Sequence, residues 1–180
     1  MGRQVSFSWQ GTGLTNTGLV RQTNQDAFVV DNDLGLWIVA DGMGGHAGGG
    51  TASQLAVNAV TDHLASAAIS FPDFHNRIDQ VEGLLRSAVA AADSLIRATA
   101  DTTPDLKGMG TTIVIGLFCP GPDPSMALAH VGDSRAYLIR DHGISALTTD
   151  HSFVQRLVSE GRISLDDART HPQQNVLLRA

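Results

Sequence analysis

Two long helical stretches separate two groups of short apolar segments, and this order limits the fold more than any other feature. Apolar residues recur at helical spacing from Ala52 to Leu64 and again from about Phe74 to Ala98. The short segments have the composition of strands: Ala27–Val30, Leu36–Ala40, Thr111–Phe118, Met126–Val131 and Arg135–Ile139. Because the strands are grouped rather than alternating with helices, we expect an α+β fold with mainly antiparallel sheet.

Turn and capping signals add local detail. Gly132-Asp133-Ser134 lies between two strand segments and predicts a tight hairpin there. Helical spacing after Asp150 predicts a further helix. The segment Ser164-Leu-Asp-Asp167 has the form of a capping box and predicts another short helix.

Composition excludes several classes of protein. The 180 residues suit one domain, and 42% hydrophobic against 17% charged residues argues against disorder. The formal net charge of −6 argues against nucleic acid or an anionic membrane as partner. A single cysteine, Cys119, excludes an intrachain disulfide. With no apolar run of about 20 residues and no recognisable signal peptide, we expect a cytoplasmic protein.

Three aspartates stand at the ends of apolar segments or beside glycine. Asp41 precedes Gly42, Asp133 follows Gly132, and Asp26 comes directly before a strand segment. For any single one of these, a simple turn is the better interpretation. Taken together they make a metal site plausible, since carboxylate-rich sites favour hard cations such as Mg²⁺ or Mn²⁺ over zinc.

Two glycine-rich segments could in principle bind nucleotides. The loop that begins Gly42-Met-Gly-Gly-His46 lacks the Gly-Lys-Ser/Thr ending of a triphosphate loop, and Asp41 would repel phosphate unless a cation intervened. The second segment, Gly108-Met-Gly110, leads into a strand and not into a helix. We therefore reject a nucleotide site at either segment.

Five motifs occur in a fixed order along the chain. They are Arg21-Gln-Thr-Asn-Gln-Asp-Ala-Phe28, Val39-Ala-Asp-Gly-Met-Gly-Gly-His46, Gly108-Met-Gly-Thr-Thr112, His130-Val-Gly-Asp-Ser-Arg-Ala-Tyr137 and Leu147-Thr-Thr-Asp-His-Ser152. This set resembles the signature motifs of the type 2C (PPM) metal-dependent serine/threonine protein phosphatases, in their bacterial form. The resemblance runs from about Thr12 to Ala180.

The resemblance implies a central sandwich of two antiparallel β-sheets flanked by helix pairs. It also implies that residues 1–180 form a single phosphatase domain that is truncated at its carboxyl end. Residues 151–175 would be a flap over the site, with Asp150 and His151 organising its hinge.

The resemblance also implies a site. Asp41 would bridge two metal ions, and the carbonyl of Gly42 would ligate one of them. Asp26 would lie in or beside the metal shell through water, and Asp133 would help to hold a third, weaker ion. Arg21 would clamp the substrate phosphate, a role that suits its planar fork of donors. The implied cofactors are Mg²⁺ or Mn²⁺, and the implied catalytic residues are Arg21 and Asp41.

The expected activity is hydrolysis of phosphoserine and phosphothreonine in proteins by a metal-activated water. Phosphorylated proteins would be the partners, together with a serine/threonine kinase that shares those substrates. A histidine that many eukaryotic members carry two residues after the bridging aspartate is replaced here by Met43. His46 lies three residues further on and could donate a proton only if the loop folded back, so we expect metal-bound water to be the proton source.

Besides the replacement at Met43, the sequence departs from the family pattern at its carboxyl end. The family carries a further Asp-Gly and an Asp-Asn after the flap, and the sequence stops at Ala180 without them. Two interpretations stay open: a fragment of a longer enzyme, or a degenerate relative that serves as a catalytically silent regulatory or binding module. A different metal-dependent hydrolase is a third, weaker option. In either of the first two cases we expect exposed strand edges and apolar surface.

Overall fold

The computed structural model describes residues 8–44, 48–70, 78–120 and 124–180. The elements in chain order are β1 (Asp26–Asp31), β2 (Leu36–Met43), α1 (Gly48–Ser70), α2 (Ile78–Thr102), the 3₁₀ turn η2 (Pro104–Leu106), β3 (Gly110–Thr111), β4 (Ile113–Cys119), β5 (Ser125–Val131), β6 (Tyr137–Arg140), β7 (Gly143–Ala146), α3 (Phe153–Ser159) and α4 (Leu165–Thr170). The predicted start of the second helix at Phe74 lies outside the described residues.

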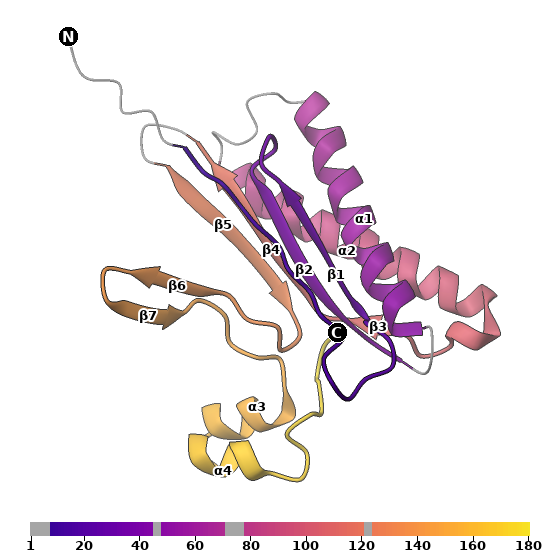
Figure 1. The fold of residues 1–180 in the computed structure, drawn as a ribbon, viewed down its shortest axis with the longest axis vertical. Helices are drawn as coiled ribbons and strands as arrows, with labels where there is room; N and C mark the ends of the chain where they lie inside the picture. The colour runs from indigo at the N-terminus through magenta and orange to yellow at the C-terminus, as the bar shows by residue number, and fades with distance from the viewer. Residues whose placement is uncertain (1–7, 45–47, 71–77, 121–123) are drawn as a thin grey trace.

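One antiparallel sheet organises the molecule. Its strands follow the order β1-β2-β4-β5, with the short β3 paired to the end of β2. The long helices α1 and α2 lie together against one face of this sheet (Figure 1). The prediction of an α+β fold built on antiparallel sheet is confirmed.

The predicted hairpin at Gly132-Asp133-Ser134 is wrong. Strand β5 pairs with β4, and β6 pairs with β7 in a separate two-stranded sheet. Gly132 has φ 99°, so the chain does turn there, but it leaves the large sheet instead of folding back along β5. A local turn signal reports the change of direction and not the strand that the next segment will join.

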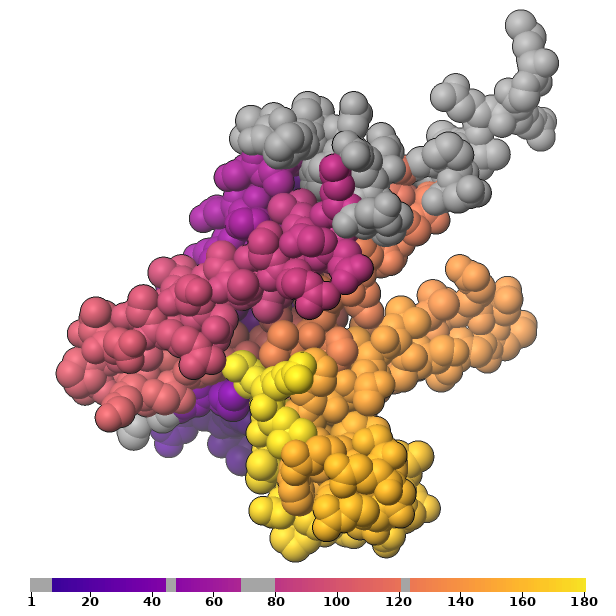
Figure 2. All heavy atoms as spheres, turned by 180° about the vertical axis from the view of Figure 1, so that it is seen from behind, coloured from indigo at the N-terminus to yellow at the C-terminus, as the bar shows by residue number. Residues whose placement is uncertain are grey.

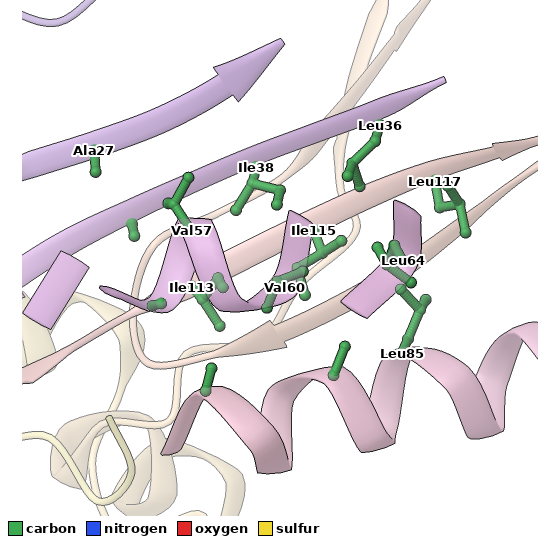
Figure 3. Close-up of a cluster of buried hydrophobic side chains, with 14 of the residues drawn as sticks. Ala27, Leu36, Ile38, Val57, Val60, Leu64, Leu85, Ile113, Ile115 and Leu117 are labelled. Carbon is green, nitrogen blue, oxygen red and sulfur yellow. The ribbon is translucent and has the colours of Figure 1, made fainter. Parts of the chain in front are cut away.

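The core lies between the sheet and the two long helices. Strand β2 alternates, with Leu36, Ile38 and Ala40 buried on the helix side. Figure 3 shows Leu36 and Ile38 of β2 in one cluster with Val57 and Val60 of α1. Burial of Val57, Val60 and Leu64 at helical spacing explains why α1 packs against the sheet.

The opposite face of the large sheet is only partly covered. The amino-terminal segment runs over it, and the ring of Trp9 packs at 4.2 Å from the ring of Phe118. Phe28, Val39 and Met126 on the same face are 37%, 48% and 50% exposed. Apolar surface is therefore exposed as expected, and Ile139 on β6 adds to it.

The carboxyl-terminal segment forms a small separate lobe (Figure 2). Ser152 caps α3 by accepting a hydrogen bond from the Gln155 N–H, and Ser164 forms a complete capping box with Asp167. Both predicted short helices are confirmed. Among the helices that the structure describes, none combines the length and apolar character needed to cross a membrane.

Candidate metal and phosphate site

Asp26 and Asp41 face each other across the first two strands. They are register partners in the antiparallel β1–β2 pair, and both side chains lie on the face away from the helices. Thr15 donates a hydrogen bond of 3.0 Å to Asp26 Oδ2. The two carboxylates line a hollow of about 260 Å³ together with Ser134. The structure thus brings together two of the predicted metal-site residues.

The electrostatics of Asp41 reflect this crowding. Partial burial of the carboxyl raises the pKa of Asp41, and the charge of Asp26 raises it further, with a smaller contribution from Asp133. The charge of Arg21 acts in the opposite direction and lowers the pKa of Asp41. A cation in the hollow would relieve the repulsion that these carboxylates exert on one another.

Gly42 is fixed by close packing. Its N–H donates to the Gln25 carbonyl at 3.1 Å, and a Cβ at this position would lie 1.9 Å from the carbonyl oxygen of Gly49. The hydroxyl of Ser53 donates to the same Gln25 carbonyl at 2.7 Å. The first turn of α1 can therefore approach β2 only because glycine occupies both positions. The role that the resemblance implied for Gly42, a carbonyl ligand to a metal ion, is separate from this packing role.

Two consecutive threonines hold the backbone of Asp41. The N–H of Asp41 donates to Thr112 Oγ1 at 3.0 Å, and the carbonyl of Asp41 accepts from the Thr112 N–H at 2.9 Å. Thr111 Oγ1 donates to the same carbonyl at 3.0 Å. Our sequence reasoning rejected Gly108-Met-Gly-Thr-Thr112 as a nucleotide motif but missed this role. The available sequence signal was the pair of threonines at the start of the predicted strand Thr111–Phe118.

The loop that carries Asp133 is attached on two sides. Thr112 Oγ1 and Ser134 Oγ lie 2.6 Å apart on one side. On the other side, Gly132 accepts a 2.9 Å hydrogen bond from the His151 N–H, and its own N–H donates to His151 Nδ1 at 3.3 Å. Asp133 itself is exposed. The loop therefore links the sheet to the start of the carboxyl-terminal lobe.

His151 is held as a neutral ring. Burial lowers the pKa of His151, and the neighbouring His130 and Arg179 lower it further, while Asp150 opposes them. The rings of His130 and His151 stack with centroids 4.5 Å apart. A neutral ring is required for Nδ1 to accept from Gly132, so the low pKa and the hydrogen bond agree.

Arg135 and Asp150 form the second link to the lobe. The guanidinium donates to both carboxylate oxygens, at 2.7 and 2.6 Å. These hydrogen bonds raise the pKa of Arg135. The pair joins the segment after Asp133 to the residues that precede α3, which is where the sequence had placed a hinge.

Arg21 stands apart from the carboxylate pair. It is exposed and lines its own shallow hollow with Gln22, Thr23 and Gln25. Its charge nevertheless reaches Asp41, as the effect on the pKa of that residue shows. Arg21 thus lies within electrostatic range of the acidic hollow, and its contact with phosphate stays a prediction.

The acidic hollow contains few side chains that could ligate a metal ion. In the part of the chain that the structure describes, no group of three or more His, Cys, Asp or Glu side chains is close enough to hold a metal ion. The roles of Asp26, Asp41, Gly42 and Asp133 as metal ligands therefore stay predictions. His46 lies outside the described residues.

An antiparallel sheet with a helix pair on one face and an acidic pair at the end of its first two strands agrees with the class that the motifs predicted. The profile of the protein phosphatase 2C family matches residues 16–173. The chain belongs to the protein phosphatase 2C family.

Individual relatives agree. The chain is 41% identical over 166 residues to the serine/threonine protein phosphatase PstP of Mycobacterium tuberculosis, covering 92% of this chain and 30% of that protein. It is 37% identical to the serine/threonine phosphatase stp of Listeria monocytogenes, covering 92% of this chain and 64% of that protein. A crystal structure of the catalytic domain of PstP with two manganese ions superposes with a TM-score of 0.72 at 39% identity, covering 91% of this chain and 62% of that one. The chain thus spans less than two thirds of the length of these relatives.

Proposed function

We propose that the chain serves the hydrolysis of phosphoserine and phosphothreonine in proteins, as a metal-dependent serine/threonine phosphatase. The observation that carries this proposal is the pairing of Asp26 with Asp41 at a solvent-facing hollow. Family membership supports it, because relatives with 37–41% identity bear the name of serine/threonine phosphatases.

The oxygen donors of the hollow suit Mg²⁺ or Mn²⁺. Asp26 and Asp41 supply hard carboxylate ligands, the Gly42 carbonyl adds a neutral one, and Asp133 is near enough to influence Asp41. The manganese ions of the related PstP structure support this choice. A divalent cation supplies a nucleophile for phosphate ester hydrolysis by lowering the pKa of the water it carries.

The chain's own residues would then have separate tasks. Asp41 and Asp26 hold the cations, and Arg21 binds phosphoryl oxygens through its planar fork of N–H donors. The exposed position of Arg21 leaves it accessible to a phosphate group on a large substrate. We also propose that residues 151–175 act as a flap within a single domain, since Arg135–Asp150 and Gly132–His151 tie its base to the Asp133 loop.

The state of the cysteine bears on the cellular compartment. The one cysteine, Cys119, is buried and free, which suits a reducing compartment. We propose a cytoplasmic protein whose partners are phosphoproteins and the serine/threonine kinase that modifies them.

Phosphate release from a phosphothreonine peptide tests the proposal. We expect release with Mn²⁺ and none in excess chelator, and Asp41→Ala should abolish it. An Asp62→Ala variant, which removes an exposed carboxylate on α1, should behave as wild type. A protein that binds the phosphopeptide but releases no phosphate with any divalent cation would instead be a silent binding module.

A further inference from the structure

The hydroxyls of Thr112 and Ser134 join two carboxylate-bearing segments that are far apart in the sequence. Thr112 Oγ1 accepts from the Asp41 N–H at 3.0 Å and lies 2.6 Å from Ser134 Oγ. Ser134 is the residue after Asp133 and lines the hollow with Asp26 and Asp41. A chain of two hydroxyls therefore runs from the backbone of one predicted metal ligand to the neighbour of another.

The direction of the hydrogen bonds follows from counting hydrogens. A threonine hydroxyl has one hydrogen and two lone pairs. Thr112 is 3% exposed, and within the described part of the chain its hydroxyl has two partners, the Asp41 N–H and Ser134 Oγ. Since the first can only donate, the hydrogen of Thr112 must go to Ser134, because a buried hydroxyl without an acceptor is costly. Thr112 is thus the donor to Ser134.

Packing reinforces this contact. Gly132 lies directly over Thr112, and a Cβ on Gly132 would be 2.6 Å from Thr112 Cγ2. The side of the loop that faces the lobe is held by His151 through two hydrogen bonds. The loop is therefore restrained on both sides, by His151 toward the lobe and by the Thr112–Ser134 contact toward the sheet.

We propose that Thr112 and Ser134 are positioning residues that fix the Asp133 loop relative to Asp41, so that both carboxylates serve one cation-binding hollow. This inference rests on the proposed metal-dependent function. Neither hydroxyl needs to touch the cation, because each acts through the residue it holds. Residues that orient metal ligands in this way typically change metal affinity by about 10–100-fold.

Four variants test the inference by Mn²⁺ calorimetry and by hydrogen exchange of the Asp41 amide in the metal-free chain. Thr112→Val keeps the branched shape but removes both hydrogen bonds of the hydroxyl. We expect at least about 10-fold weaker Mn²⁺ binding and faster exchange of the Asp41 amide. Thr112→Ser keeps the hydroxyl and should restore both properties. Thr148→Val is the matched control, because Thr148 is also buried and accepts a backbone hydrogen bond, from Ala136 at 3.1 Å.

Ser134→Ala separates positioning from general destabilisation. Ser134 is half-buried, so the variant should fold, and Thr112 still accepts from the Asp41 amide. We expect weaker Mn²⁺ binding with unchanged Asp41 amide exchange. Unchanged Mn²⁺ affinity in both Thr112→Val and Ser134→Ala, or an equal loss in Thr148→Val, would overturn the inference. If the wild-type chain bound no Mn²⁺ at all, the proposed function would fail, and the amide exchange would decide the hydrogen-bond chain by itself.

Discussion

Replacing Asp41 with asparagine should stabilise the metal-free protein at pH 7 and remove its stabilisation by Mn²⁺. The amide keeps the size of the side chain and removes the charge that faces Asp26 across the β1–β2 pair. The substitution therefore removes the repulsion between the two carboxylates together with the cost of partly burying the Asp41 charge. Most single substitutions destabilise, but a functional site can carry a stability cost that a substitution removes.

The magnitude follows from the register. Residues directly opposite in an antiparallel pair have Cβ atoms about 5 Å apart, and like charges there destabilise by up to about 1 kcal/mol. Coulomb's law gives about 0.8 kcal/mol at that separation in a water-like dielectric. Because both carboxylates are solvent-exposed and salt screens them, we expect a gain of about 0.5 kcal/mol at physiological ionic strength. For a domain of this size the melting temperature should rise by about 1–2 °C.

The pH dependence fixes the sign. Burial and then Asp26 raise the pKa of Asp41 above 3.8, so the folded protein binds this proton more tightly than the unfolded chain does. The contribution of Asp41 to stability therefore falls as pH rises from 3.8 through the raised value. The advantage of Asp41→Asn should be present at pH 7 and vanish near pH 3.

Urea unfolding at pH 7 and pH 3, with and without Mn²⁺, measures these effects. Without metal the asparagine variant should be the more stable protein at pH 7. Saturating Mn²⁺ should reverse the order, since a ligand that binds only the folded state stabilises it. Asp62→Asn on α1 controls for the general loss of negative charge. An Asp41→Asn variant that is less stable than wild type without metal at pH 7 would refute the reasoning.

Further substitutions test the remaining contacts. Gly42→Ala should lower the free energy of unfolding by about 1–3 kcal/mol in chemical denaturation, because its Cβ would lie 1.9 Å from the Gly49 carbonyl oxygen. Gly83→Ala is the contrasting substitution: nothing lies within 4 Å of its Cβ, so it should stabilise α2. Arg135→Lys loses the bidentate pair with Asp150 and should lower stability by about 0.5–1 kcal/mol by the same measure. Because the pKa of His151 is lowered, its contribution to stability should be lost as pH falls below 6.5 through that lowered pKa. A smaller protection factor for exchange of the Gly132 amide would report this loss.

The sequence predicted the local elements well where the signal was local. Apolar and β-branched composition identified β1, β2, β4 and β5, helical spacing after Asp150 identified α3, and the capping box at Ser164 identified α4. Each of these signals is contained within a few residues. The pairing of Asp26 with Asp41 was implied only loosely, because the register depends on the turn at Asp31–Asp33.

The errors and omissions concern contacts between distant segments. The hairpin expected at Gly132 is wrong because β6 pairs with β7, the strand that follows it, and β5 pairs with β4. The hydrogen bond between the Asp41 N–H and Thr112 Oγ1 joins residues 71 positions apart, and the spacing of apolar residues in the sequence does not predict it. Only the ordered motifs pointed to such contacts, and they gave residue identities without a geometry.

The hydrogen-bonded surroundings of Asp41 explain how its repulsion toward Asp26 can be used. In a flexible loop two like charges would simply move apart. Here the neighbouring register pair Ala27–Ala40 fixes the strand separation, and Thr112 holds the Asp41 backbone through its N–H and carbonyl. Since the strand backbones cannot separate without breaking these contacts, the repulsion is relieved either by protonation, which the raised pKa of Asp41 reflects, or by a cation bound between the carboxylates. The backbone contacts at Ala27–Ala40 and Thr112 thus keep the two carboxylates together. Their repulsion slightly destabilises the metal-free fold, and the same arrangement favours binding of a divalent cation.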